Sequence, residues 1–198
     1  MNRHFTISTN QFLTMKKKSI FVILFVITFL SCNQSDKKTE NSPDAAFDET
    51  VETAAIMKVI DNETKCFFAG DYEGWASNWS HQNYAMQAWN DSDATSAAAI
   101  GWEKINSQGK GWIEKYYKNG KNVIHPDVKR KKPIVKFFSE KSAYLNWEQY
   151  NADSEKKYYN VSHEIRIMEK EADGWKIVNV SAFWWVKPKV RADSLTIE

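Results

Sequence analysis

The chain has 198 residues, of which 42% are hydrophobic and 26% are charged, and its formal net charge is +2 at pH 7. The first 32 residues hold four of the 27 basic residues and none of the 25 acidic ones, so the remainder carries a net charge of −2. The length predicts a single globular domain, and the charge balance excludes a strongly basic nucleic-acid-binding protein.

A secretion leader is predicted at the N-terminus. Lysines occupy positions 16–18, an apolar run covers residues 20–30, and Ser31 and Cys32 follow. A basic start, an apolar stretch and a small residue at the cleavage point are typical of a signal peptide. The apolar run is shorter than the roughly 20 residues that cross a bilayer. We expect translation to begin at Met15, because residues 1–14 do not fit the basic region of such a leader.

The end of this leader, FLSC at positions 29–32, resembles a bacterial lipobox. The resemblance implies that Cys32 carries lipid and anchors the mature protein to a membrane of the bacterial cell envelope, facing the periplasm or the exterior. The alternatives are an ordinary cleaved signal peptide and an uncleaved anchor. If Cys32 carries lipid, Cys66 has no partner within the chain, which excludes a disulfide scaffold.

Three short helices are predicted in the first half of the mature chain. Polar residues 33–49 predict a flexible tether, followed by a folded domain over 50–188 and a tail over 189–198. Apolar residues at helical spacing predict a helix over 50–69 that ends at Gly70. Asp71 is expected to cap a short helix over 72–79. A strand over 82–89 and a helix over 102–118, kinked near Gly109 or Gly111, are expected next.

From position 122 onward, the apolar residues recur with a period of two. Strands are predicted over 123–126, 133–138, 142–150, 157–169 and 174–186, separated by short turns. Short turns between long alternating strands predict an antiparallel meander. The helices precede the strands along the chain, and the strands are expected to form a curved antiparallel sheet. This order predicts the α+β class, with the helices covering one face of the sheet.

The sequence resembles a nuclear transport factor 2-like domain of the SnoaL-like kind over about residues 51–187. The resemblance lies in AGDYEGW at 69–75, GWEKI at 101–105 and DGWKIV at 173–178. It implies a cystatin-like, cone-shaped roll, in which a strongly curved sheet wraps around helices and leaves a cavity at its wide end. The family includes isomerases, dehydratases, cyclases and proteins with no known reaction, so the resemblance does not fix an activity.

Two residues are candidates for acid–base chemistry. Glu63 lies on the apolar face of the first helix, where burial raises the pKa of a carboxyl group toward neutral pH. His163 lies on the more apolar side of a predicted strand and could transfer a proton near neutral pH. The alternatives are a paired or solvated Glu63 at the edge of the apolar stripe and a hydrogen-bonded His163 in the core.

A ligand pocket rich in aromatic side chains is also predicted, because all nine tryptophans follow the leader. Asn179, which strand alternation places on the same face as Trp175 and Ile177, could bind a ligand carbonyl or make a structural hydrogen bond. No motif for a cofactor or a metal is found. The aromatic candidates, which could instead belong to the core or a dimer interface, are Trp79, Tyr84, Trp89, Trp102, Trp147, Tyr150 and Trp184.

These observations predict an envelope lipoprotein whose domain holds a small apolar or aromatic molecule without converting it. One alternative is an isomerase, dehydratase or cyclase that uses Glu63 or His163 as its acid or base. Another is a module that dimerises through its sheet. The expected partners are therefore a membrane, reached through Cys32, a small molecule and a second copy of the chain, with no nucleic acid.

Overall fold

The computed structural model describes residues 46–91, 93, 95–118, 121–122, 127–185 and 189–197. The predicted leader, the lipidation site at Cys32 and the strand predicted over 123–126 lie outside this range. Within the described ranges, no helix combines the length and the hydropathy that a membrane span requires.

The three predicted helices form close to their expected positions. Helix α1 covers Glu49–Ala69, α2 covers Tyr72–Ala76 and α3 covers Trp102–Tyr116. Asp48 caps α1 by accepting a hydrogen bond from the Thr50 amide at 2.8 Å, and Gly70 ends it in the left-handed region at φ 74°. Helix α3 continues without a break through Gly109. A Cβ at this position would overlap the indole ring of Trp75.

The strands form one large mixed sheet in the order β2-β1-β9-β8-β7-β5, with β10 paired to β8 and β6 paired to β7. Strands β6, β7, β8 and β9 make the predicted antiparallel meander. A separate small pair is formed by β3 and β4. The strands are β1 Met86–Asn90, β2 Ser96–Ile100, β3 Tyr117–Lys118, β4 Lys121–Asn122, β5 Val128–Arg130, β6 Ile134–Ser139, β7 Ser142–Ala152, β8 Tyr158–Glu171, β9 Gly174–Trp184 and β10 Val190–Arg191.

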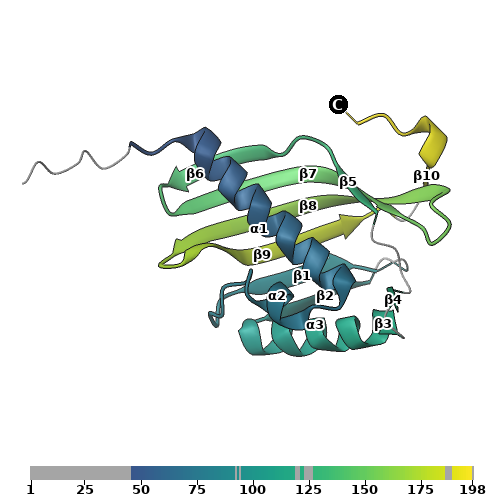
Figure 1. Ribbon diagram of the computed structural model, residues 1–198, viewed down its shortest axis with the longest axis horizontal. Helices are drawn as coiled ribbons and strands as arrows, with labels where there is room; N and C mark the ends of the chain where they lie inside the picture. The colour runs from purple at the N-terminus through teal and green to yellow at the C-terminus, as the bar shows by residue number, and fades with distance from the viewer. Residues whose placement is uncertain are drawn as a thin grey trace, which may run out of the picture. The chain divides into compact units, whose positions relative to one another are not determined.

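Two features of the sheet differ from the sequence prediction. Strand β2 was not predicted, because Ser-Ala-Ala-Ala-Ile has weak strand propensity and no polar alternation. Strand β1 pairs with β9 in parallel, so the sheet is mixed and not purely antiparallel. The α+β class itself is confirmed: Figure 1 shows α1 lying across one face of the curved sheet.

The main core lies between the helices and the sheet face that they cover, which we call the inner face. Ile56 and Ile60 of α1 pack there with Leu145, Met168 and Ile177 of the strands. A second cluster forms where residues of the tail pack on one end of the sheet. Tyr150, Ala152, Tyr159 and Val161 contact Val190, Ala192, Leu195 and Ile197 in this cluster. The segment expected to be a tail therefore packs on the domain and adds strand β10.

A bulge in β9 changes which residues face inward. Ile167 pairs with Asn179 while Met168 pairs with Ile177, so Val178 is an extra residue on β9. The alternation of side chains is thereby shifted by one position after Ile177. Asn179 therefore points to the outer face, and the prediction that it shares a face with Trp175 and Ile177 is wrong.

Candidate functional site

A cavity of about 300 Å³ lies between the helices and the inner face of the sheet. This volume is at the lower end of the range typical of small-molecule sites, about 300–1,000 Å³. Part of the lining is aromatic and comes from all three helices and the end of β9. These side chains are Phe67 and Phe68 of α1, Trp75 of α2, Trp112 and Tyr116 of α3 and Trp184 of β9.

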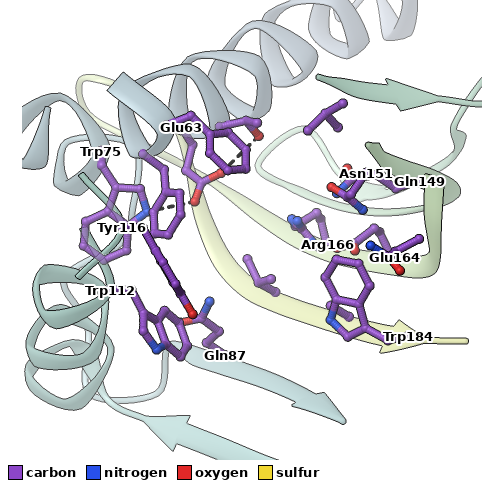
Figure 2. A pocket seen from close by; sticks show the side chains of 17 residues that line it. Glu63, Trp75, Gln87, Trp112, Tyr116, Gln149, Asn151, Glu164, Arg166 and Trp184 are labelled. Carbon is purple, nitrogen blue, oxygen red and sulfur yellow. Dashed lines mark hydrogen bonds and ion pairs between the residues drawn. The ribbon is translucent and has the colours of Figure 1, made fainter. Parts of the chain in front are cut away.

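Polar side chains also line the cavity, and Figure 2 shows how the main ones lie. Glu63 comes from α1 and Gln87 from β1. The others come from the long central strands: Gln149 and Asn151 from β7, and Asn160, Glu164 and Arg166 from β8.

Glu63 is held at the cavity wall by two hydrogen bonds. Trp75 Nε1 donates to Oε1 at 2.8 Å, and Thr64 Oγ1 donates to Oε2 at 3.3 Å. One side of Glu63 borders the cavity, but its carboxyl group lies deep in the protein, and this burial raises the pKa of the carboxyl. The charge of Arg166 and the hydrogen bond from Trp75 oppose the rise without reversing it. Glu63 is thus suited to hold a proton at a higher pH than an exposed glutamate.

A buried ion pair forms part of the β8 wall. Glu164 and Arg166 are two residues apart and therefore point to the same face of the strand. Arg166 Nη1 lies 2.8 Å from Glu164 Oε2, and Ser162 Oγ donates to Glu164 Oε1 at 2.6 Å. The Arg166 guanidinium also lies over the Trp147 ring, 5.1 Å from its centroid. Because desolvating two charges offsets their attraction, such a pair need not add to the stability of the fold.

A second polar chain joins α1 to the sheet. Arg130 of β5 donates from Nη1 to Asp61 Oδ1 at 2.6 Å and from Nη2 to Thr64 Oγ1 at 2.8 Å. Its Nε donates to Gln149 Oε1 at 2.9 Å, and Gln149 Nε2 donates in turn to Asn151 Oδ1 at 3.2 Å. This chain fixes the orientation of the Gln149 and Asn151 amides, which are two of the four that line the cavity.

Several buried polar atoms at the cavity have no hydrogen-bond partner. Across the described residues, four buried side-chain atoms are unpaired, and three of them belong to residues that line the cavity: Gln87 Oε1, Asn151 Nδ2 and Arg166 Nε. Buried polar groups are nearly always hydrogen-bonded in native proteins. Their concentration here indicates that the cavity normally holds water or a polar ligand group.

Among the sequence candidates for catalysis and ligand binding, the structure places Glu63 in the cavity lining, together with Trp184 from the wider aromatic set. His163 is exposed on the outer face, where it pairs with Glu148 on one side and Phe183 on the other. Tyr84 is 53% exposed and donates a hydrogen bond to Glu169. Neither side chain reaches the cavity.

The other candidates are structural in this arrangement. Trp79 is buried against Trp75, with ring centroids 5.9 Å apart. Trp147 is buried in the main core, and the Arg166 guanidinium lies over its ring. Asn179 accepts a hydrogen bond from Ser181 Oγ at 3.2 Å. Trp102 lies in a row of rings, 5.9 Å from Trp75 and 4.0 Å from His81.

The sequence analysis missed the polar residues of β8 because it took the wrong side of the strand as the inner one. Tyr159, Val161 and His163 form the more apolar side, yet Glu164 and Arg166 are the residues that face the helices. The tail covers Tyr159 and Val161 on the outer face, so apolar character there does not mark the core. A Ser-x-Glu-x-Arg pattern at 162–166, polar on one side only, was the available signal.

Comparisons with known proteins support the fold but not an activity. No family model matches the sequence, and no curated protein matches it. Among solved structures, an NTF-2-like protein of unknown function from Shewanella oneidensis superposes with a TM-score of 0.52 and 15% identity, covering 66% of this chain and 98% of the other. A cystatin-like fold protein from Burkholderia xenovorans gives 0.51 and 15%, covering 71% and 96%.

A third structure of similar fold is the association domain of C. elegans CaMKII, with a TM-score of 0.51 and 18% identity over 68% of this chain and 96% of the other. At these identities the comparisons establish the fold alone. The curved mixed sheet, the three helices on its inner face and these superpositions agree with the resemblance found in the sequence. The described domain therefore has the nuclear transport factor 2-like, cystatin-like fold.

Proposed function

We propose that the domain binds a small molecule with a flat, apolar body and holds it without converting it. The observation that carries this proposal is the cavity of about 300 Å³ with six aromatic side chains in its lining. Its described lining contains no His, Lys or Cys side chain, and Glu164 and Arg166 are paired with each other. Outside this ion pair, the acid–base groups of the described lining are Glu63 and the phenol of Tyr116.

The expected affinity is modest. A flat bicyclic molecule that buries about 200 Å² of apolar surface gains roughly 5 kcal/mol at ~25 cal/mol per Å², before the cost of association. This corresponds to dissociation constants nearer the millimolar than the nanomolar range for a simple hydrocarbon. The assay must therefore detect weak binding at high protein concentration.

Naphthalene is a suitable first probe, and the indole N–H signals of the ¹⁵N-labelled protein report its binding. We expect the signals of Trp75, Trp112 and Trp184 to shift on titration. Ala182→Phe, which fills the cavity from β9, should abolish these shifts, whereas Ala97→Phe on exposed β2 should retain them. Equal binding by the two variants would contradict the proposal.

An enzymatic role is the second candidate, and the raised pKa of Glu63 at the cavity wall favours it. Isomerases and dehydratases remove a proton next to a carbonyl group, which requires a base with a pKa near the working pH. If Glu63 is such a base, the protein should accelerate deuterium exchange at the methyl group of 2-acetylnaphthalene in D₂O. Glu63→Gln should remove the acceleration; exchange at the uncatalysed rate with the native protein would exclude this activity for that ketone.

We also propose that the protein is a lipoprotein of the bacterial envelope, anchored through Cys32. The lipobox-like FLSC sequence supports this, and two or three acyl chains suffice for stable membrane attachment. Cys32→Ala should release the protein from the membrane fraction of cells and prevent its labelling by radioactive fatty acid.

A further inference from the structure

The strongest unused feature of the cavity is a pair of buried donors without acceptors. Arg166 Nε and Asn151 Nδ2 have no hydrogen-bond partner, and each residue is only 6% exposed. Both residues belong to the lining of the same cavity (Figure 2). An unpaired buried donor is unfavourable, and the penalty is larger for a charged group. A ligand acceptor that bonds to these atoms also removes this penalty. The hydrogen bond therefore contributes more binding free energy than one between groups that are otherwise solvated.

The orientation of each donor is fixed by its neighbours. Arg166 Nη1 donates to Glu164 Oε2 and to the carbonyl of Ile165 at 3.0 Å, while the guanidinium lies over Trp147. These contacts leave Nε as a donor in a set direction. The site is therefore preformed, and a ligand does not have to order the arginine side chain.

The hydrogen-bond network also assigns the Asn151 amide. Gln149 Oε1 accepts from Arg130 Nε and from Trp147 Nε1 at 3.3 Å, so the other end of the Gln149 amide must be the donor. That donor, Nε2, faces Asn151, whose nearer atom must then be the acceptor Oδ1. The free atom of Asn151 is consequently Nδ2, a donor, by the chemistry of its neighbours.

The charges around the cavity favour a neutral acceptor over an anion. Glu164 already neutralises Arg166, and Asp61 already neutralises Arg130. Glu63 is the third ionisable side chain of this region that could carry a full charge, and burial raises the pKa of its carboxyl group, which favours the neutral form. A ligand carboxylate would add an uncompensated charge to this region, and buried charges require a partner. A carbonyl oxygen adds none.

We propose that the ligand carries a neutral oxygen acceptor, such as the carbonyl of a ketone, aldehyde, ester or amide, which bonds to Arg166 Nε with Asn151 Nδ2 as the second available donor. This inference rests on the proposed binding function and defines its ligand class. The aromatic side of the cavity takes the flat apolar body, and the β7–β8 side takes the polar group.

Three probes that share one ring system test the inference: naphthalene, 2-acetylnaphthalene and 2-naphthoate, each titrated against the native protein by the indole N–H signals. We expect the ketone to bind at least about tenfold more tightly than naphthalene, which is the typical effect of a hydrogen bond to a charged donor. The carboxylate should bind more weakly than the ketone. A ketone no tighter than naphthalene, or a carboxylate tighter than the ketone, would overturn the inference.

Two variants locate the effect. Arg166→Lys keeps a positive charge for Glu164 but lacks the Nε donor, and it should reduce the ketone-to-naphthalene affinity ratio to about one. Asn151→Asp keeps the acceptor for Gln149, removes the free donor, and should lower the same ratio. Arg191→Lys makes the same change as the first variant in an exposed pair with Asp193, and it should leave the ratio as in the native protein.

The outcomes separate the two proposals. Binding of naphthalene without preference for the ketone refutes the ligand class and leaves the binding function standing. Failure of both naphthalene and the ketone to bind refutes the binding function, and the ligand class with it. If Arg166→Lys does not fold, the probe series on the native protein and Asn151→Asp still decide the question.

Discussion

Two glycines of α3 allow a sharp test of how the helix meets the cavity wall. Gly109 is buried, and a Cβ at this position would overlap the ring of Trp75, whereas nothing lies within 4 Å of a Cβ at Gly111. Alanine normally stabilises a helix relative to glycine by roughly 0.5–1 kcal/mol. Overpacking of a buried site costs roughly 1–3 kcal/mol. Because helix propensity is common to both sites, the difference between the two alanine variants isolates the packing cost.

We expect Gly111→Ala to raise the free energy of unfolding by roughly 0.5–1 kcal/mol. The free energy of unfolding of Gly109→Ala should be about 1–3 kcal/mol lower than that of Gly111→Ala. Urea unfolding followed by circular dichroism measures both values. Gly109→Ala should also disturb the hydrogen bond from Trp75 to Glu63 and shift the Trp75 indole N–H signal. Equal stability of the two variants would refute the close contact between α3 and Trp75.

Three further predictions follow from the buried charges and the outer face. Because burial raises the pKa of Glu63 above its ordinary 4.5, the contribution of Glu63 to stability is fully present below pH 4.5 and is lost as the pH rises through the folded-state pKa. The free energy of unfolding in urea should therefore fall as the pH is raised above 4.5, and this fall should be absent in Glu63→Gln. Glu164→Ala leaves Arg166 buried without its partner and should cost about 3–5 kcal/mol, whereas the double variant Glu164→Met/Arg166→Leu should cost far less, as thermal unfolding will show. Phe183, 52% exposed on the outer face, is proposed as part of a homodimer contact; Phe183→Asp should then lower the sedimentation coefficient, and Val51→Asp on the helix side should not.

The helices and the meander were predictable because their signals are local. A helical apolar stripe ended by Gly70 defined α1, and alternation with short turns defined β7, β8 and β9. Strand β2 and the parallel pairing of β1 with β9 depend on contacts between distant segments. The bulge at Val178 changes the facing of every later residue in β9 by one position, and no local pattern marks it.

The cavity was predictable only in part for the same reason. Glu63 was found because an acid within an apolar stripe is conspicuous in the sequence. Arg166 and Asn151 were not found, since alternation in a strand separates two faces without telling which one the helices cover. The C-terminal segment packs on Tyr159 and buries the outer face of β8, so the more apolar face of this strand is not the one that points toward the helices.

The row of rings formed by Trp75, Trp102 and His81 runs from the lining of the cavity to an exposed side chain. The Trp75 and Trp102 rings are stacked, with an interplanar angle of 28° and centroids 5.9 Å apart, so a guest that tilts the first indole should also disturb the second. Intrinsic tryptophan fluorescence, to which all nine tryptophans contribute, should therefore change when a guest contacts Trp75, and it can be used to screen compounds with no label attached to the protein.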